Sequence, residues 1–399
     1  MISQVKRTYK YRIYPTHKQI STLENTFSMC RHLYNWNLAE RIAVYEAEKR
    51  TVSYNEQQNK LPDLKKEKAW FKSVHSQVLQ DVLRRLDNGF KHFFRRLKTG
   101  EVPGFPRFKK KGEWNSICYP QYADFPEKGC VAVPKLGNIK IVYHRELPDT
   151  AKIKTLTIEK EAGKWFACFS FEQELEIEPK QGFSAIGIDL GLIDFFYTSS
   201  GLHVSAPKNL RKKENQLAKL QRKLARTPKR TPKYYALKHA IAKTHFRIKC
   251  RRNDFLHKQS LELMEQGDTL CLENLSVSKM MKRPEKIQDE TGIFLQNGAK
   301  YKAMLNKSIA DAGWSKFVDI LKYKVQTKGK TLVQINPKYT SQKCSECGEI
   351  VKKSLSTRTH RCPFCGYVAN RDENAAKNIL RLGLESLGLS LEAHAIAQA

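Results

Sequence analysis

The first part of the chain alternates apolar and polar residues in short runs. Residues 4–14 place Val5, Tyr9 and Ile13 at odd positions and mainly Lys, Arg and Thr at even positions. This period of two predicts a half-exposed strand that ends at Pro15. Strand-like runs recur at 131–134, 139–143, 153–159 and 165–171. We expect these strands to join residues 4–14 in a small β-barrel domain made of residues 1–15 and 100–180.

Helical periodicity fills the sequence between the first strand and the later ones. Apolar residues recur every three or four positions after Thr16, a residue type that caps helices, so a long helix is predicted to begin there. The same spacing predicts a second helix from about Ser73 to Leu97. We expect residues 16–99 to form a helical insertion in the barrel.

Beyond residue 181, short apolar runs are separated by longer helical stretches. Strands are predicted at 185–190, 269–275 and 331–335, with a hairpin of 195–198 and 202–204. Helices are predicted as two pieces within 208–252, one piece over 305–328, and a last helix from near Arg371. This alternation indicates an α/β domain, which we place at 181–340 and 370–385. Residues 386–399 are expected to be a flexible tail.

The charge balance narrows the class of function. The chain has 399 residues with 72 Lys and Arg against 40 Asp and Glu, a formal charge of +32. Such self-repulsion is typical of proteins that bind polyanions rather than small metabolites. Membrane-surface binding is the alternative, but the basic residues are spread through the chain rather than set on one amphipathic helix. No apolar run approaches the roughly 20 residues of a membrane span.

One segment is far more basic than the rest. Between Lys208 and Arg252 there are seventeen Lys and Arg residues and a single acid, Glu214. A solvated helix face normally mixes both signs of charge, so this segment is predicted to contact nucleic acid. The candidate contacts are Lys212, Lys213, Arg222, Lys223, Arg251 and Arg252.

A second candidate lies in the loop 100–111, which interleaves aromatic and basic residues. Phe105, Arg107 and Lys109 suit contact with phosphate and stacking on bases or sugars. The alternative is a rigid loop of Pro and Gly that packs two phenylalanines. The sequence leaves both interpretations open.

Four cysteines have the spacing of a zinc site. Two Cys-x-x-Cys pairs, Cys344 with Cys347 and Cys362 with Cys365, lie fourteen residues apart. This spacing predicts a structural zinc ion held by four thiolates in residues 341–369. Chance spacing or a redox pair is the alternative. The other six cysteines are scattered singly, as expected of reduced thiols in a cytosolic protein.

Three acids occupy positions that suit metal binding. Asp189 and Glu273 stand near the ends of apolar strands, and Asp372 opens the helix beyond the cysteines. Converging carboxylates hold two Mg2+ or Mn2+ ions about 4 Å apart in enzymes that hydrolyse phosphodiesters. Each signal is weak alone, since acids often end strands and Asp372 is well placed to cap its helix. Residues 187–191 and 311–313 also match the phosphate loops of actin-like ATPases, which would leave the charge and the cysteines unexplained.

Several motifs together resemble one family. They are Gly187-Ile-Asp-Leu-Gly191, Leu272-Glu-Asn-Leu275, Ser308–Trp314, the four cysteines and Arg371–Ile379, with Tyr14-Pro-Thr16, Tyr34-Asn35 and Gly104–Phe108 in the N-terminal half. This set resembles the TnpB family, the transposon-encoded proteins related to type V CRISPR effector nucleases. The resemblance covers residues 4–383 in the family's order.

The resemblance implies an RNA-guided DNA endonuclease with a RuvC domain of RNase H fold, interrupted by the zinc ribbon. It implies a guide RNA from the transposon end, a target double-stranded DNA and a short flanking motif beside the target. Asp189, Glu273 and Asp372 carry over as the catalytic metal-binding triad, which argues against nuclease-dead relatives. Contacts that read the flanking motif carry over loosely to Tyr54, Ser76, Gln77 and Gln80.

Two other classes of function remain open from the sequence. A transposase that joins DNA strands would use the same acids without RNA, and an RNA-guided repressor or an RNA-chaperone module would not need Asp189. We expect a monomeric ribonucleoprotein in the prokaryotic cytosol, associated with the nucleoid, and no membrane partner. The first residues do not resemble a signal peptide.

Overall fold

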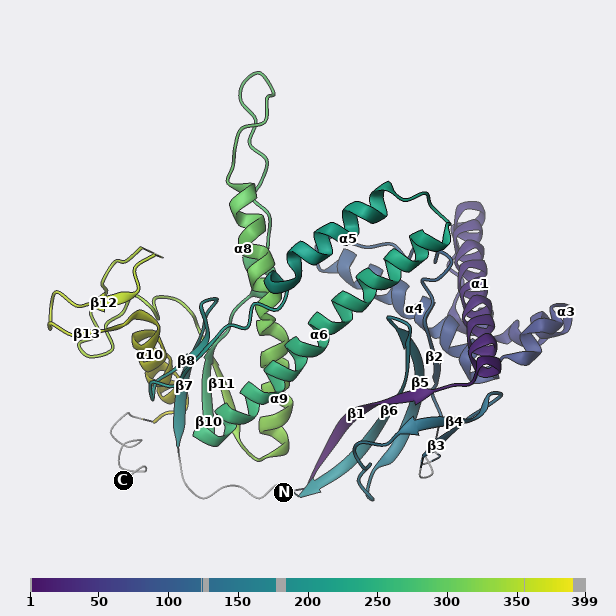
Figure 1. Ribbon diagram of the computed structural model, residues 1–399, viewed down its shortest axis with the longest axis horizontal. Coiled ribbons are helices and arrows are strands. Elements are labelled where there is room, and N and C mark those ends of the chain that lie inside the picture. The colour runs from purple at the N-terminus through teal and green to yellow at the C-terminus, as the bar shows by residue number, and fades with distance from the viewer. Residues whose placement is uncertain (1, 123, 125–128, 177–183, 355, 390–399) are drawn as a thin grey trace. The chain divides into compact units, whose positions relative to one another are not determined.

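The structure is a computed structural model that describes residues 2–122, 124, 129–176, 184–354 and 356–389. It divides into two compact units, Ile2–Leu175 and the residues from Glu176 onward. These are called the N-terminal and C-terminal units below (Figure 1). Residues 177–183 and residues 390–399 of the predicted tail lie outside the described residues. No helix of the described part is both long and apolar enough to cross a membrane.

The N-terminal unit is a six-stranded sheet with a helical insertion between its first two strands. Its strands run in the order β2-β5-β6-β1-β4-β3. The strands are β1 (Ile2–Tyr14), β2 (Ser116–Tyr119), β3 (Cys130–Val133), β4 (Gly137–Val142), β5 (Lys152–Glu161) and β6 (Lys164–Glu176). Strands β2 and β3 form the two edges, and no strand pairing joins them among the described residues. Closure into a barrel therefore stays a prediction.

The helical insertion lies between β1 and β2 in the chain. It consists of α1 (His17–Glu48), α2 (Tyr54–Asn59), α3 (Leu61–Glu67), the 3-10 helix η1 (Ala69–Ser73) and α4 (Ser76–Lys98). Thr16 caps α1 as predicted, because its side chain accepts a hydrogen bond from the Gln19 amide while Gln19 bonds back to Thr16. Helix α4 begins three residues later than predicted, since His75 is the N-cap after the 3-10 turn.

The C-terminal unit is built on a five-stranded mixed sheet in the order β11-β10-β7-β8-β9. The strands are β7 (Ala185–Leu190), β8 (Asp194–Thr198), β9 (His203–Ser205), β10 (Thr269–Glu273) and β11 (Thr331–Ile335). Strand β7 is antiparallel to β8 and parallel to β10, and β10 is parallel to β11. Parallel neighbours need helical crossovers, which explains the long helices between these strands.

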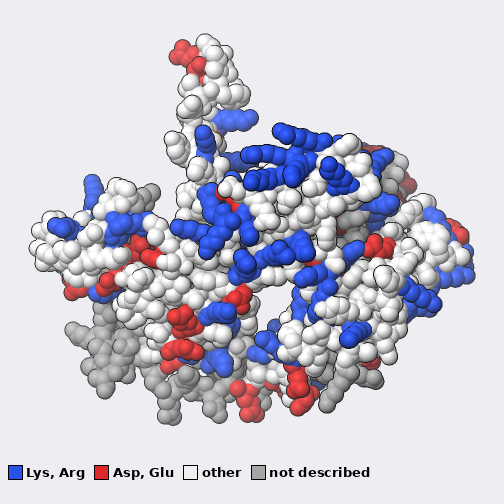
Figure 2. Space-filling model, in the orientation of Figure 1, with Lys and Arg blue, Asp and Glu red and all other residues white. Residues whose placement is uncertain are grey.

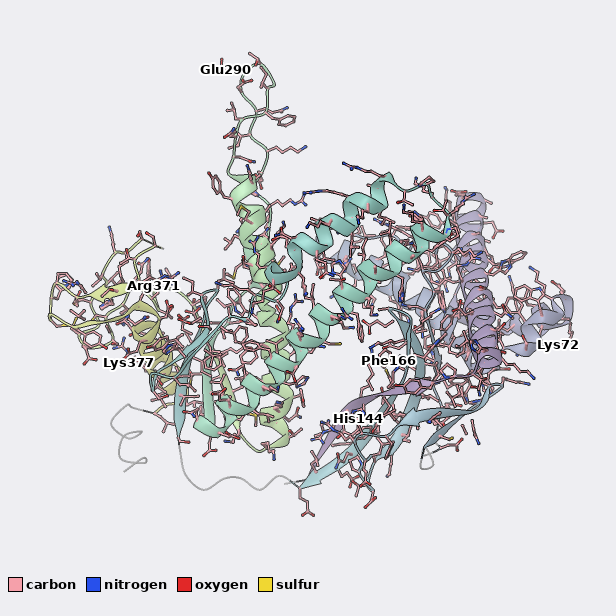
Figure 3. The ribbon with its side chains drawn as sticks, in the orientation of Figure 1. Lys72, His144, Phe166, Glu290, Arg371 and Lys377 are labelled. Atoms are coloured by element: carbon pink, nitrogen blue, oxygen red, sulfur yellow. The ribbon has the colours of Figure 1, made fainter. Side chains whose placement is uncertain are left out.

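The helices of this unit are η2 (Arg211–Lys213), α5 (Glu214–Arg226), α6 (Pro232–Gln266), α7 (Val277–Met280), α8 (Ala299–Ala312), α9 (Trp314–Thr327) and α10 (Arg371–Ser386). Strands β12 (Thr359–Arg361) and β13 (Val368–Asn370) form a separate ribbon. The core includes Phe195, Leu272 and Phe317, which are fully buried. Figure 3 shows Glu290 at the tip of the loop that leads into α8.

The prediction of one helix over 305–328 is wrong. The structure forms two helices, α8 and α9, separated by Gly313. Gly313 has φ of 72°, a left-handed conformation that ends a helix and that glycine adopts without strain. The break between α8 and α9 was missed by the sequence analysis, because the helical spacing of apolar residues continues on both sides of Gly313.

Helix α10 packs on the sheet at a point where no side chain fits. A Cβ atom added to Gly187 of β7 would lie 2.0 Å from the carbonyl oxygen of Ala376 and 2.6 Å from the amide nitrogen of Leu380. Both are backbone atoms of α10, so a side chain at 187 can be accepted only if the helix moves. Gly187 therefore sets how closely α10 approaches β7.

We predict that Gly187→Ala lowers the free energy of unfolding of the C-terminal unit by at least about 2 kcal/mol, because forced overpacking costs about 1–3 kcal/mol or more. Urea unfolding followed by circular dichroism measures the loss. The control is Gly89→Ala in α4, where an added Cβ would lie 3.6 Å from Pro106 in ordinary contact. Equal stability of Gly187→Ala and wild type would refute the close packing of α10 on β7.

Candidate active site

Two of the predicted acids lie at the same end of two neighbouring parallel strands. Asp189 and Glu273 each come one position after Ile188 and Leu272, the last residues that pair β7 with β10. Because the strands are parallel, their carboxyl ends meet at one edge of the sheet. The structure thus brings together two residues that are 84 positions apart in the chain.

Asp372 reaches the same place from the first turn of α10. Asp189 has a pKa raised well above its ordinary value, first by burial and then by the negative charges of Glu273 and Asp372. Arg371 and Arg358 oppose this rise. The carboxylates of Glu273 and Asp372 therefore lie close enough to Asp189 to act on its charge. All three residues are half-buried.

The alternative role of Asp372 as a helix cap is wrong. Asn370 is the N-cap residue of α10, and its Oδ1 accepts a hydrogen bond of 2.8 Å from the Asp372 amide. The Asp372 carboxylate instead lies 3.5 Å from Arg358 Nη1 and 3.4 Å from Arg371 Nε. Figure 3 shows Arg371 beside the start of α10. The Asp372 carboxylate is therefore held at the site by two arginine side chains and does not cap the helix.

Glu273 is oriented by a residue that the sequence analysis did not select. The hydroxyl of Thr340, which is buried, donates a hydrogen bond to Glu273 Oε1. Burial raises the pKa of Glu273, and the bond from Thr340 works against that rise. Thr340 thus favours the ionised form of Glu273 and fixes one of its two oxygens.

The three acids are spaced more widely than ligands of a single ion. Among the described residues, the cysteines form the only group of three or more ligand side chains whose atoms lie within 4.8 Å of one another. No side chain in the described part donates a hydrogen bond to the Asp189 carboxylate. A partly buried carboxylate without a donor, beside two others, suits hard divalent cations such as Mg2+.

The four cysteines have the geometry of a tetrahedral zinc site. Cys344 Sγ lies 3.7 Å from Cys365 Sγ, and Cys347 Sγ lies 3.5 Å from Cys362 Sγ. A zinc ion bonded to four sulfurs at about 2.3 Å places them about 3.8 Å apart in a tetrahedron. Gly348 and Gly366 follow the two Cys-x-x-Cys pairs with φ of 83° and 74°, as the tight turns require. The cluster fits zinc.

Two buried asparagines of α10 fasten the cysteine ribbon to the helix that carries Asp372. Asn374 Oδ1 accepts from the Ser345 amide at 2.9 Å, and its Nδ2 donates to the Lys343 carbonyl at 2.8 Å. Asn378 Nδ2 donates to the carbonyls of Lys343 and Thr340, at 2.7 and 2.9 Å. Hydrogen bonds therefore connect the first cysteine turn to Thr340 and so to Glu273.

Thr340, Asn374 and Asn378 were missed as functional residues by the sequence analysis. The two asparagines stand four residues apart, on one face of a helix. Both are fully buried or nearly so. Two asparagines four residues apart, in the helix that follows the cysteine ribbon, were the sequence feature that could have predicted this contact. Nothing in the sequence pointed to Thr340.

The basic residues of the C-terminal unit form a surface over α5 and α6, as Figure 2 shows. Lys212 and Lys213 belong to η2, and Arg222 and Lys223 to α5. Arg251 is an exposed residue of α6. Their contact with nucleic acid stays a prediction.

Arg252 differs from these residues, because its Nη2 donates to the buried Asp311 at 3.0 Å. The other oxygen of Asp311 accepts from the Leu210 amide at 2.8 Å. Asp311, which matches an ATPase loop in sequence, is thus engaged in holding α6, α8 and the segment before α5 together. Arg252 serves this structural network.

The remaining predicted contacts all lie in the N-terminal unit. Tyr54 begins α2 and lies beside Arg84 of α4, whose first turns carry Ser76, Gln77 and Gln80. The Ser76 hydroxyl accepts from Lys65 at 2.7 Å, and Gln77 donates to Gln121 at 3.2 Å. Phe105, Arg107 and Lys109 line a cavity of the same unit.

Comparison with known proteins decides the family. The family OrfB_IS605, described as "Probable transposase", matches residues 168–284, and a family described as "Cas12f1-like, TNB domain" matches residues 314–379. A family described as "Helix-turn-helix domain" matches residues 1–50, where the structure has one strand and one long helix.

A relative from Streptomyces pristinaespiralis, provisionally named an RNA-guided DNA endonuclease, is 34% identical over 96% of this chain and 91% of its own length. TnpB-like protein L79 of Acanthamoeba polyphaga mimivirus is 24% identical over 94% of this chain and 73% of its own length. The chain belongs to the TnpB family.

A further TnpB relative is InsQ of Escherichia coli K12, also provisionally named an RNA-guided DNA endonuclease. It is 31% identical over 94% of this TnpB chain and 92% of its own length. Among solved structures, Cas12f1 in its complex with sgRNA and target DNA gives a TM-score of 0.55 at 12% identity, over 94% of this chain and 98% of that chain. The chain has an α/β fold similar to that of Cas12 effectors.

We predict that Cys344→Ser lowers the zinc affinity of the chain by more than about 100-fold, because even residues that only bond to ligands contribute about 10–100-fold. The thermal midpoint should fall too, since metal binding contributes to folding. Zinc content after dialysis and differential scanning calorimetry measure both effects. Cys250→Ser, an exposed thiol in α6, is the control. Stoichiometric zinc in Cys344→Ser would mean that the cluster is not a zinc site.

Proposed function

We propose that this TnpB chain is an RNA-guided DNA endonuclease whose catalytic centre is formed by Asp189, Glu273 and Asp372. The convergence of these three carboxylates at one edge of the β7–β10 sheet carries the proposal. Its substrate would be double-stranded target DNA beside a short flanking motif, selected by base pairing with a guide RNA from the transposon end. The names of the two bacterial relatives support this function.

The three carboxylates would hold two divalent cations, Mg2+ or Mn2+. Such ions, when bound, activate the attacking water and stabilise the leaving 3′ oxygen of a phosphodiester. The chain supplies the negative charge that offsets them: Asp189 from β7, Glu273 with one oxygen fixed by Thr340, and Asp372 beside Arg358. Arg358 and Arg371 would neutralise phosphate charge next to the carboxylates.

The fold supports assignment of the C-terminal unit as a RuvC-like nuclease domain of RNase H fold. Three antiparallel strands, β9, β8 and β7, are followed by parallel β10 and β11. We assign residues 181–340 and 370–385 to this domain and 341–369 to the zinc ribbon within it. The N-terminal unit would combine the barrel, 1–15 and 100–180, with the helical recognition insertion, 16–99.

The positive surface over α5 would hold the guide RNA or its duplex with the target. Positive charge is supplied there by Lys212, Lys213, Arg222 and Lys223. Glu214 is the single acid between Lys208 and Arg252, and it is paired with Arg211. Phosphate contacts of this kind give affinity without sequence information, which base pairing then provides. The working form would be a monomeric ribonucleoprotein in the cytosol of a prokaryotic cell.

Asp189→Asn tests the catalytic centre. We predict that cleavage of a guide-matched plasmid falls by at least about 100-fold, because the divalent cations would lose one of the three carboxylates that would hold them, while binding of guide and target is retained. The matched variant Asp194→Asn changes an acid of the next strand, β8. Wild-type cleavage rates in Asp189→Asn would rule out this triad, and binding without any cleavage by wild type would favour an RNA-guided repressor.

The same variant should be more stable than wild type when no divalent cation is added. The raised pKa of Asp189 means that the folded protein binds its proton more tightly than the unfolded chain does. The stability that this contributes is present at low pH and is lost as pH rises through the folded pKa. Asparagine avoids that loss, so unfolding at neutral pH should require more urea. A lower midpoint for Asp189→Asn would contradict the raised pKa of Asp189.

Thr340→Val tests the support of Glu273. Valine keeps the shape of threonine but removes the hydroxyl that bonds to Glu273 Oε1. We predict that the Mg2+ concentration for half-maximal cleavage rises about 10-fold, the lower end of the effect of residues behind metal ligands. Thr340→Ser, which keeps the hydroxyl, should behave as wild type. An unchanged Mg2+ dependence in Thr340→Val would exclude this role.

A further inference from the structure

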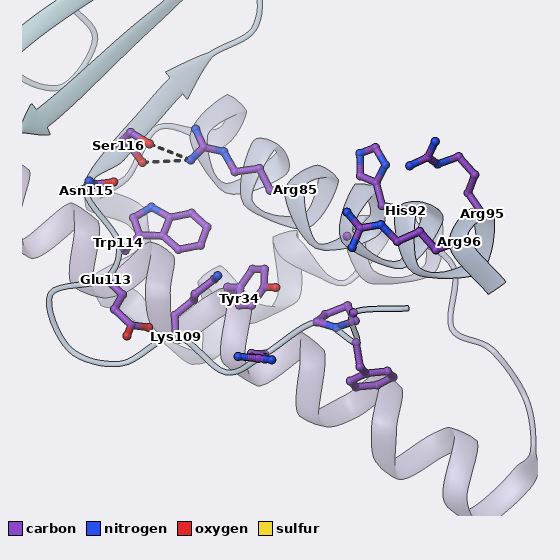
Figure 4. A pocket seen from close by; sticks show the side chains of 15 residues that line it. Tyr34, Arg85, His92, Arg95, Arg96, Lys109, Glu113, Trp114, Asn115 and Ser116 are labelled. Carbon is purple, nitrogen blue, oxygen red and sulfur yellow. Dashed lines mark hydrogen bonds between the residues drawn. The ribbon is translucent and has the colours of Figure 1, made fainter. Parts of the chain in front are cut away.

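The N-terminal unit contains a cavity that the proposed cleavage mechanism does not use. Its volume is about 690 Å3, within the range of ligand sites. One wall is a face of α4, and the other is the loop 104–116 (Figure 4). Tyr34 of α1 lies at the junction of the two walls.

The loop wall is fixed in place before any ligand binds. Asn35 of α1 makes two hydrogen bonds to the backbone of Lys109: its Nδ2 donates to the carbonyl at 3.0 Å, and its Oδ1 accepts from the amide at 2.8 Å. At the other end of the loop, the Phe105 ring meets Phe90 and Phe93 of α4 edge to face, with ring centres 5.5 and 5.4 Å apart. A binding loop held at both ends loses little entropy on binding.

The lining of the cavity is strongly cationic. Helix α4 presents Arg85, His92, Arg95 and Arg96, and the loop adds Arg107 and Lys109. Glu113 is the single acid of the lining, and its Oε2 already accepts from the Lys110 amide at 2.9 Å. Arg95 and Arg107 have no acidic partner within the described residues. This excess of positive charge favours an anionic ligand.

Trp114 provides the second, independent indication of a ligand. Its side chain is only 8% exposed, yet its indole Nε1 has no hydrogen-bond partner among the described residues. An indole N–H can only donate, and leaving a buried donor unpaired costs about 1–3 kcal/mol. The Arg85 guanidinium lies 5.4 Å from the Trp114 ring and Lys109 Nζ 5.6 Å from the Tyr34 ring, so the aromatic walls lie beside cations.

We propose that this cavity binds one nucleotide of a single-stranded nucleic acid. Arg95 and Arg107 would bind its phosphate, and Tyr34 with Trp114 would contact the base, with the indole N–H donating to an acceptor on it. A nucleotide has an anionic phosphate and a flat base, and a cavity that contains both cations and aromatic rings can bind both parts. The identification of nucleic acid as the polyanion rests on the proposed function, whereas the anionic and aromatic character of the ligand does not.

The experiment uses the full chain and short single strands of RNA and DNA that carry a photoreactive thio-base. After ultraviolet irradiation, peptide mass spectrometry locates the crosslinks, and their yield against strand concentration gives an affinity for this cavity alone. We expect crosslinks to Tyr34 or Trp114. A preference for the RNA strand would identify a guide nucleotide, and a preference for the DNA strand a target nucleotide.

Three variants separate the contributions. Arg107→Gln should weaken crosslinking about 10-fold or more and lower the salt slope by about one, as for one lost phosphate contact. Trp114→Phe should weaken it about 5-fold with the slope unchanged, because only a neutral donor is lost. Lys98→Gln, an exposed residue at the end of α4 outside the cavity, is the control and should change neither quantity.

Each outcome decides between alternatives. Absence of crosslinks in the cavity, or equal effects of Arg107→Gln and Lys98→Gln, would overturn the proposal. Full competition by inorganic phosphate at the concentration of the strands would reduce the cavity to a site for small anions and would also overturn it. Cavity crosslinks in a chain that cuts no DNA would reject the endonuclease function and keep the nucleotide site.

Discussion

The close approach of α10 to β7 is the packing contact on which the candidate active site depends. Gly187 lets the backbone of the helix come within a distance that excludes even a methyl group. That contact sets the position of the first turn of α10, where Asp372 lies. Asp189 stands two residues after Gly187 on the same strand, so one glycine governs the distance between two of the three carboxylates.

A second chain of contacts runs from the cysteine cluster to the third carboxylate. Asn374 and Asn378 bind the backbone around Cys344, Asn378 also binds the Thr340 carbonyl, and the Thr340 hydroxyl binds Glu273. A zinc ion in the cluster would therefore stabilise more than its own ribbon. These hydrogen bonds give a physical reason why the ribbon is inserted directly before the helix that carries Asp372.

The candidate active site carries an excess of negative charge, whereas the candidate nucleic-acid sites carry an excess of positive charge. Burial, together with the negative charges of Glu273 and Asp372, raises the pKa of Asp189 and leaves a site that gains from binding cations. The surface over α5 and the cavity beside α4 carry an excess of Lys and Arg, which suits phosphates. Each arrangement costs free energy in the isolated chain and becomes favourable only with a ligand of opposite charge.

The sequence alone determined most of the elements and the candidate chemistry of this protein. Alternation and helical spacing located β1, α1 and most strands of the two sheets, but not β2 or the break between α8 and α9. The cysteine spacing and three acids pointed to the candidate metal sites, because such patterns are local. The family resemblance then grouped the acids. Only the tertiary structure decided that Asn370 caps α10, that Thr340 and two asparagines support the site, and that α4 shares a cavity with the loop 104–116. Apart from the Asn370 cap, which is a local contact, these contacts join residues distant in the chain, and no periodicity records which buried polar groups meet.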